Sequence, residues 1–221
     1  RQADSLLVKN IESQTESSFR ATTLGFTKAT QVNQDISQDP SPDSPFDNID
    51  QGVVLYELAI NSEHKRIVAQ TTQSSALDID LYLIFDANED NTPQESEVLA
   101  SSTSSGAIEY IDSIDLSAGK YWLMVQNYEG SGNSETDSFT LFYAAVSPSE
   151  DNSSLSFIVH YQVITGDAFD IRSSWNIVNT QEDERYYGLV AFGGLSDNDS
   201  AGLTRVNLIK GEQDVELRST A

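Results

Sequence analysis

A regular series of short strand-like segments between residues 53 and 146 limits the fold more than any other feature of this sequence. Each segment is rich in β-branched and aromatic residues and is bounded by Gly, Asn, Ser or Asp, which favour tight turns. The seven segments are residues 53–60, 66–73, 77–86, 97–102, 107–114, 120–129 and 137–146. No stretch of convincing length has the apolar period of a helix. The pattern predicts an antiparallel β-sandwich.

A polar run at residues 147–154 separates this series from a second one, and we interpret it as a linker. The second series consists of residues 155–163, 169–178, 185–194 and 203–210. We therefore predict an all-β chain of two antiparallel β-sandwich modules of the jelly-roll or immunoglobulin-like kind. The first occupies residues 50–146, and a smaller immunoglobulin-like one occupies residues 155–221.

The first 49 residues contain two further strand-like segments, residues 5–12 and 17–30, the second with a bulge expected near Gly25. Residues 34–52 hold three prolines among Asp and Ser, and we interpret them as a connection, because proline lacks the N–H that a strand ladder needs. We expect residues 1–49 to be part of the first sandwich or the end of a preceding module.

The charge balance limits the partners of the chain. Its 35 acidic and 12 basic residues give a net charge of -23, which repels nucleic acid and anionic lipid, so we expect neither nucleic acid nor membrane as a partner. Such a surface suits extracellular surroundings. There is no cysteine, which excludes disulfides and thiolate metal sites, and no apolar run of about 20 residues for a membrane span. A start without Met indicates a piece of a longer protein.

The segment from residue 77 alternates between apolar and polar side chains, as a strand with one buried face does. We expect one face to be core and the other to be wet. The expected core face is Leu77, Ile79, Leu81, Leu83 and Phe85, and the expected wet face is Asp78, Asp80, Tyr82 and Asp86.

The strand leads into a loop with the ligand spacing of a calcium site. A twelve-residue frame starts at Asp86 and ends at Glu97, as in the loops that bind Ca²⁺ with carboxylate and carbonyl oxygens. The candidate ligands are Asp86, Asn88, Asp90, Thr92 (through its main-chain carbonyl) and Glu97. The ion would be structural, because it would join clustered negative charges and stabilise a long connection.

Other features of the same loop favour a simple solvated acidic hairpin, and this alternative stays open. Asn91 stands where the calcium loop of helical proteins has glycine, Pro93 stiffens the middle, and strands flank the loop. A second acidic cluster at residues 195–202 holds Asp197 and Asp199, but Asp-Asn-Asp-Ser is ordinary turn chemistry.

The sequence offers little for catalysis. Its histidines, His64 and His160, are both interpreted as surface residues, and there is no Gly-x-Ser-x-Gly turn for a nucleophile. Two separated histidines also make a poor zinc site. A hydrolase with paired carboxylates stays open only because 35 acids always supply some pair. We expect no catalytic residue in this chain.

The aromatic residues allow two interpretations. A stacking platform for sugar or peptide would form if several of them lay on an exposed sheet face, whereas core or inter-domain packing is the simpler expectation. The residues concerned are Tyr82, Tyr110, Trp122 and Tyr128. Trp175 lies on the apolar face of its strand, and we predict that it is a core residue.

Three motifs in residues 50–146 carry a resemblance to a known family. They are D-x-D-L-Y at Asp78 to Tyr82, L-A-S-S at residues 99–102, and G-K-Y-W-x-x-V at residues 119–125, which Q-N-Y-E-G-S-G follows. Together they resemble the pre-peptidase C-terminal domain that follows the catalytic domain in many secreted bacterial peptidases. Residues 166–177 and 185–194 also resemble the module after that domain in large subtilisin-like serine peptidases.

The resemblance implies a non-catalytic C-terminal accessory region of a secreted subtilisin-like serine peptidase, with the catalytic domain upstream in the parent chain. Such regions are thought to assist secretion or folding, or to hold substrate or protein or polysaccharide surfaces, outside the cell or at its surface. It assigns no binding residue. The alternative is a free-standing, calcium-stabilised module that binds carbohydrate or protein.

Overall fold

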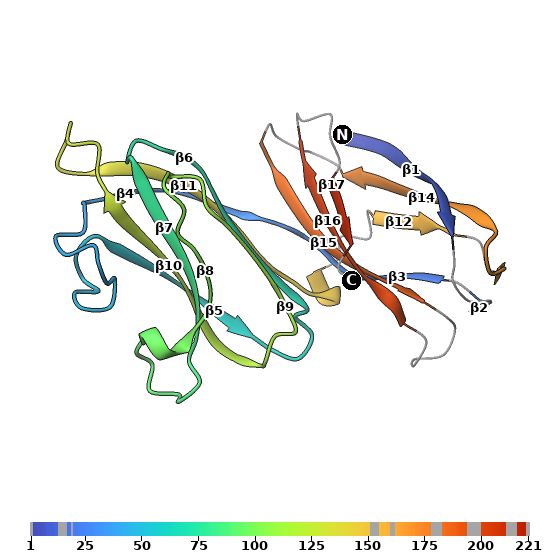
Figure 1. Cartoon of the computed structure of the whole chain (residues 1–221), viewed down its shortest axis with the longest axis horizontal. Helices are drawn as coiled ribbons and strands as arrows, with labels where there is room; N and C mark the ends of the chain where they lie inside the picture. The colour runs from blue at the N-terminus through green and yellow to red at the C-terminus, as the bar shows by residue number, and fades with distance from the viewer. Residues whose placement is uncertain are drawn as a thin grey trace. The chain divides into compact units, whose positions relative to one another are not determined.

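A computed structural model describes residues 2–12, 17–18, 20–150, 155–159, 162–177, 183–193, 200–210 and 216–219 (Figure 1). The predicted all-β fold is confirmed in these residues, where the helical segments are two short 3₁₀ turns, η1 (Glu95–Glu97) and η2 (Pro148–Glu150). Within the described part of the chain, no helix is long and apolar enough to cross a membrane.

The chain divides into two compact units. The central unit is Thr30–Ala145, and the split unit combines Arg1–Ala29 with Val146–Ala221. The central unit therefore interrupts the chain of the split unit, which is built from both ends of the sequence.

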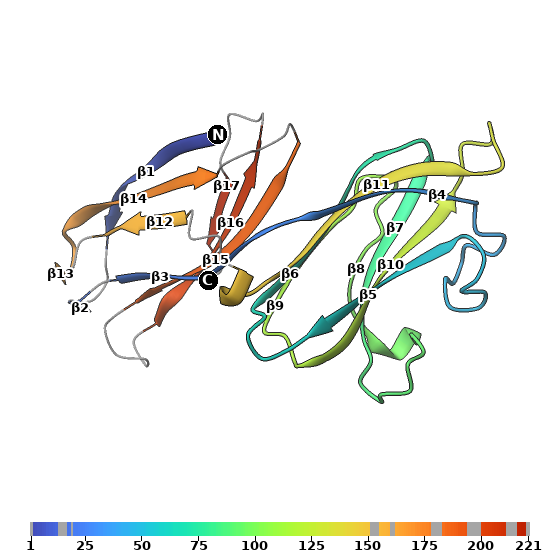
Figure 2. The ribbon, with the colours of Figure 1, turned by 180° about the vertical axis from the view of Figure 1, so that it is seen from behind.

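The central unit contains two four-stranded antiparallel sheets, β5-β10-β7-β8 and β4-β11-β6-β9, seen from opposite sides in Figures 1 and 2. Every connection except that between β7 and β8 moves the chain from one sheet to the other, which is the arrangement of an eight-stranded jelly roll. The strands are β4 (Thr30–Ile36), β5 (Val53–Ile60), β6 (Arg66–Ser74), β7 (Asp78–Phe85), β8 (Val98–Ser102), β9 (Tyr110–Ile114), β10 (Gly119–Glu129) and β11 (Asp137–Val146).

The main core of the central unit lies between these two sheets. Ile79, Leu81 and Leu83 of β7 are fully buried there, as predicted from their alternation, whereas Leu77 precedes the strand and is exposed. Tyr121 of β10 packs against Phe85 with ring centroids 4.8 Å apart and ring planes inclined by 37°. Burial of this apolar surface is the largest favourable contribution to folding of the unit.

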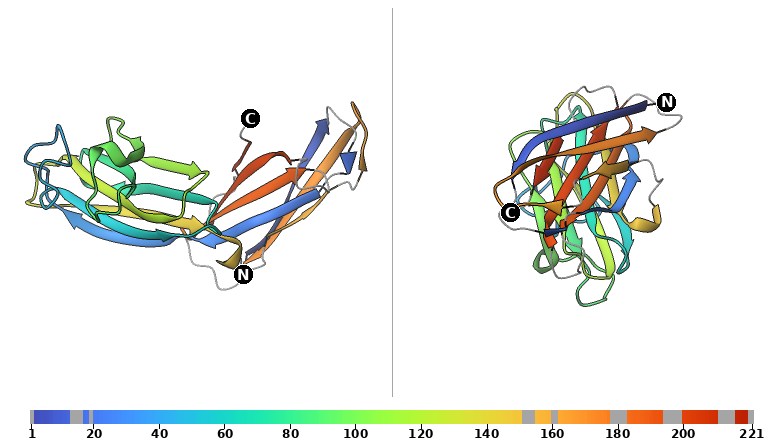
Figure 3. Two further views of the ribbon diagram at one scale, coloured as in Figure 1. Left: turned by 90° about the horizontal axis from the view of Figure 1, so that it is seen from below. Right: turned by 90° about the vertical axis from the view of Figure 1, so that its right-hand side faces the viewer.

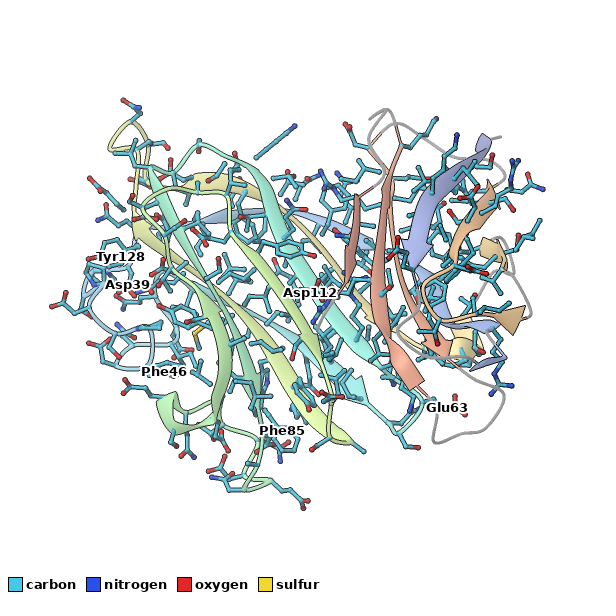
Figure 4. The ribbon with its side chains drawn as sticks, turned by 45° about the vertical axis from the view of Figure 1, so that its right-hand side comes forward. Asp39, Phe46, Glu63, Phe85, Asp112 and Tyr128 are labelled. Atoms are coloured by element: carbon cyan, nitrogen blue, oxygen red, sulfur yellow. The ribbon has the colours of Figure 1, made fainter. Side chains whose placement is uncertain are left out.

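The face of the β7–β10 sheet that points away from the main core is not exposed to solvent, contrary to our prediction. Ile84, Trp122 and Met124 are buried on this face and pack against Phe46 and Ile49. These last two belong to the proline-rich connection between β4 and β5, and Figure 4 labels Phe46 on it. The connection is mostly polar, but these two apolar side chains near its middle cover this face of the sheet.

Hydrogen bonds hold this connection in place. The Asp39 carboxylate is buried and accepts bonds from Ser41 N at 2.9 Å and from Gln126 Nε2 at 2.7 Å. The main-chain N–H of Asp39 donates to Asn127 O at 2.9 Å. A carboxylate that accepts hydrogen bonds on both oxygens tolerates burial. Because the partners of Asp39 lie both in the connection and in β10, Asp39 attaches the connection to that strand.

The split unit has sheets with the strand orders β1-β14-β12 and β17-β16-β15-β3 and a two-stranded pair β13-β2. Its buried cluster includes Trp175, which is confirmed as a core residue, together with Phe26, Val190 and Val206. The strands are β1 (Gln2–Glu12), β2 (Ser17–Ser18), β3 (Arg20–Lys28), β12 (Leu155–Ile158), β13 (Gln162–Val163), β14 (Ala168–Ile177), β15 (Arg185–Gly193), β16 (Ser200–Ile209) and β17 (Glu216–Ser219).

The first 29 residues are placed differently from our prediction. We expected residues 1–49 in the first sandwich or in a preceding module, but β1 pairs with β14 and β3 pairs with β15, both in the C-terminal part of the chain. The central unit begins with β4 at Thr30 instead of at residue 50. Side-chain alternation identifies a strand but says nothing about its partner, which explains the error.

The bulge predicted near Gly25 is present in the split unit. Phe26 of β3 lies opposite Gly188, and Thr23 lies opposite Val190, so two residues of β3 face one residue of β15. Gly25 has a φ of 137°, and a Cβ built on it would lie 2.6 Å from the main-chain oxygen of Ser147. Only glycine fits this conformation and this close approach.

Candidate functional site

The loop between β7 and β8, which includes η1, extends from the end of these two strands (Figures 1 and 3). Its first residue, Asp86, is fixed by the sheet, because its N–H donates to Lys120 O of β10 at 3.0 Å. Its last residue, Glu97, directly precedes β8. Strands on both sides thus hold the two ends of the twelve-residue frame.

The structure brings the carboxylates of Asp86 and Glu97 into the loop. Glu97 Oε1 accepts bonds from Ala87 N at 3.0 Å and from Asn88 N at 3.4 Å, and Asp86 Oδ2 accepts one from Asn91 N at 3.2 Å. Both carboxylates are buried, with 5% and 7% of the residue exposed for Asp86 and Glu97. The two end residues of the frame therefore face the same turn of main chain.

The middle of the frame is exposed and bonded within itself. Asn88 Oδ1 accepts from Asp90 N at 2.9 Å, and Asp90 Oδ1 accepts from Thr92 N at 2.8 Å. Asp90 Oδ2 accepts from Gln94 Nε2 at 2.6 Å and from Asn88 Nδ2 at 3.1 Å. These contacts turn Asp90 toward Gln94. Among the described residues, no three His, Cys, Asp or Glu side chains come close enough together to hold a metal.

Two residues of the loop adopt left-handed backbone conformations. Glu89 has a φ of 59° and Asn91 a φ of 61°. Asn91 stands where the calcium loop of helical proteins has glycine, and asparagine tolerates left-handed backbone conformations better than most residues. Asn91 thus makes the sharp turn that glycine makes in a helical calcium loop.

A buried ion pair lies in the sheet of β6 and β9, and sequence reasoning did not identify it. The Arg66 guanidinium is fully enclosed and bonds Asp112 through two nitrogens, with Nε–Oδ1 at 2.9 Å and Nη2–Oδ2 at 2.8 Å (Asp112 is labelled in Figure 4). Tyr110 also donates to Asp112 Oδ2 at 2.9 Å. The available signal was an arginine at the start of an apolar strand, which indicates a buried partner.

Asp80 is a second polar residue inside the central unit. We expected it on a wet face, but it is 6% exposed and accepts a bond from the Tyr82 hydroxyl at 3.2 Å. Burial, together with the negative charge of Asp78, raises the pKa of Asp80 to about 6. Asp80 therefore changes its charge near neutral pH.

The remaining candidates from the sequence form no site in the described residues. The His64 ring lies in its turn, with Nδ1 3.1 Å from Asn61 N, and His160 lies outside the described residues. The acidic cluster of Asp197, Asn198 and Asp199 lies outside them as well. Of the four aromatics considered as a platform, Trp122 is buried in the core and Tyr128 is exposed.

Comparisons with known proteins identify no family. No protein-family model matches the sequence, and no curated protein matches it. Two crystal structures of a GH2 beta-galacturonidase from Eisenbergiella tayi, bound to galacturonate and to glycerol, are similar at 10% and 11% identity, with TM-scores of 0.23 and 0.22. Each comparison covers 95% of this chain but only 37% of that enzyme's chain. TM-scores this low support no conclusion about fold or function.

Proposed function

We propose that this chain is a non-catalytic accessory region of a secreted subtilisin-like serine peptidase. In the parent protein it would assist secretion or folding, or hold a protein or polysaccharide substrate for the catalytic domain. The proposal is based on the three motifs that resemble the pre-peptidase C-terminal domain, and on what their residues do in the central unit.

The observation that supports the proposal is that the motif residues lie on three neighbouring strands and serve the sheet. β10 pairs with β7, and β7 pairs with β8. Leu81, Tyr121 and Val125 belong to the main core, and the Asp78 carboxylate accepts a bond from Gly106 N at 3.0 Å. Motif residues that pack in the core or bond the main chain stabilise the sheet. A rigid sheet of this kind positions the loops that bind partners.

The experiment is a deletion of this region from the parent peptidase. Active sites in the culture medium would be titrated with an irreversible serine-directed inhibitor, and cleavage of a small peptide and of an insoluble protein would be measured per active site. We expect the small-peptide rate to stay unchanged, and either the secreted yield or the rate on insoluble protein to fall several-fold.

Three results would overturn the proposal. One is a coding sequence with no peptidase domain upstream, which would favour the free-standing binding module. Another is hydrolysis of a peptide or ester by the purified chain itself that a single substitution abolishes. The third is removal of the region with no effect on yield or on either rate.

A further inference from the structure

The buried charges of the central unit are unbalanced. Six of its carboxylates are buried in the described residues: Asp39, Asp80, Asp86, Glu97, Glu109 and Asp137. The buried cation among the same residues is Arg66, and its partner is Asp112, outside this group. Burial of an ionised carboxylate is costly unless hydrogen bonds or a cation compensate for the lost water.

Four of the six find donors within the protein. Asp39 accepts from Ser41 N and Gln126 Nε2, and Asp80 accepts from the Tyr82 hydroxyl. Glu109 accepts from Ser104 N at 3.1 Å and from the hydroxyl of Ser102. Asp137 accepts from the Ser75 hydroxyl at 3.0 Å and from Ser131 N at 3.0 Å. None of these four has an enclosed oxygen without a hydrogen-bond partner. They need no ion.

Asp86 and Glu97 differ from the other four. Asp86 Oδ1 and Glu97 Oε2 are both enclosed, and neither accepts a hydrogen bond. The other oxygen of each carboxylate is held by main-chain N–H groups of the loop, which fixes the free oxygens beside that same stretch of main chain. Two enclosed anionic oxygens without donors, on the two ends of one loop, are what a bound cation would satisfy.

We propose that the loop from Asp86 to Glu97 binds one Ca²⁺, with Asp86 Oδ1 and Glu97 Oε2 as its two fixed ligand atoms. These residues are positions 1 and 12 of the frame whose remaining oxygens come from positions 3, 5 and 7. Asn88 and Asp90 supply side-chain oxygens there, and Thr92 supplies its main-chain carbonyl. This inference is independent of the proposed function.

The chemistry of the loop selects calcium among the common ions. All the donors are hard oxygens, no thiolate or imidazole is among them, and the exposed middle of the loop adapts to the irregular coordination that Ca²⁺ accepts and Mg²⁺ does not. Binding requires Asp90 to leave Gln94 and Asn88 and turn inward. Those two bonds are exposed, so the exchange costs little.

Calcium binding is measured by calorimetric titration of the purified chain at about 0.15 M KCl, which screens diffuse attraction to the acidic surface. We expect one site per chain with a Kd of about 10⁻⁴ to 10⁻³ M, the range of extracellular modules. Glu97→Gln should weaken binding at least tenfold. The matched control is Glu95→Gln, which makes the same chemical change on an exposed side chain of the same turn, and it should leave the Kd unchanged.

A second measurement separates loss of binding from loss of fold. In EDTA, the unfolding midpoint of Glu97→Gln should equal or exceed that of the unaltered chain, because an enclosed anionic oxygen is replaced by a neutral amide. Absence of heat with Ca²⁺, or equal weakening by Glu95→Gln and Glu97→Gln, would overturn the site. Equal affinity for Mg²⁺ would overturn the choice of ion. None of these results bears on whether a peptidase lies upstream.

Discussion

The two units of this chain differ in the number of carboxylates that they bury. The buried polar and charged residues of the central unit include six carboxylates, an arginine and two amides. In the described residues of the split unit they are Thr27, Ser147 and Ser173, together with enclosed nitrogens of Trp175, Arg185 and Arg205 and the Tyr187 hydroxyl, and no carboxylate residue is among them. The split unit depends on apolar packing and on the pairing of the two ends of the chain. The central unit depends also on how its charges are compensated. Its stability should therefore respond to pH and cations, and that of the split unit should not.

The chain provides a separate reporter for each unit. It contains two tryptophans, Trp122 in the core of the central unit and Trp175 in the core of the split unit. A Trp175→Phe background leaves fluorescence that reports the central unit, and a Trp122→Phe background leaves fluorescence that reports the split unit. Each further substitution is made in one of these two backgrounds and compared with it.

The largest expected effect comes from breaking the buried ion pair of the central unit. Asp112→Ala leaves the enclosed Arg66 guanidinium without its carboxylate, and we expect it to lower the free energy of unfolding of the central unit by about 3–5 kcal/mol. Urea unfolding followed by Trp122 fluorescence measures this change.

The control for this prediction is a surface pair of the same unit. Lys120 Nζ lies 2.7 Å from Glu57, whose side chain is 63% exposed. Glu57→Gln should change the free energy of unfolding by less than about 0.5 kcal/mol, because exposed ion pairs contribute little. Equal effects of the two substitutions would contradict the claim that the charges inside the unit determine its stability.

A packing defect should have its main effect in the split unit. Gly25→Ala places a methyl group against the rigid main chain of Ser147 and forces an unfavourable φ on alanine, so we expect a loss of about 2–3 kcal/mol. Urea unfolding followed by Trp175 fluorescence measures this loss.

Gly166→Ala separates the steric clash from the cost of the backbone conformation, since Gly166 also has a positive φ but has no atom within 4 Å of an added Cβ. Its cost should be about 1 kcal/mol, and an equal cost for both variants would refute the steric account.

A smaller effect concerns pH. The pKa of Asp80 is raised from 3.8 in the unfolded chain to about 6 in the folded one, so the folded state holds its proton more tightly. The corresponding stabilisation is complete below pH 4 and is lost as pH rises through 6. We expect the central unit to lose up to about 2 kcal/mol between pH 4 and pH 7 relative to the Asp80→Asn variant. Parallel pH profiles for the two proteins would show that Asp80 is not responsible.

Sequence reasoning succeeded where a strand has one clearly apolar face. The strands at Val53–Ile60 and Asp137–Val146 match their predicted ranges, because burial of alternate side chains leaves that pattern in the sequence. It missed β4, in which Val32 is only partly buried and Ile36 is the buried residue at the end. An exposed edge strand carries no alternation, so the connection was predicted to begin too early.

Two other errors have physical causes that local patterns do not contain. The partners of β1 and β3 lie near the other end of the chain, and no local pattern specifies a partner so distant in sequence. The polar-looking face of β7 is covered by Phe46 and Ile49, two apolar residues inside a polar connection. In the loop, the spacing of the acidic residues predicted ligands for one site, but it contained no sign that the Gln94 side chain would bond the Asp90 carboxylate.

The most direct test of the account is the effect of calcium on the two tryptophan reporters. With 10 mM Ca²⁺ in place of EDTA, the unfolding midpoint reported by Trp122 should rise by roughly 5 °C, and the midpoint reported by Trp175 should not move. Unchanged midpoints for both reporters, or equal shifts for both, would contradict the claim that the central unit has an interior which a cation completes.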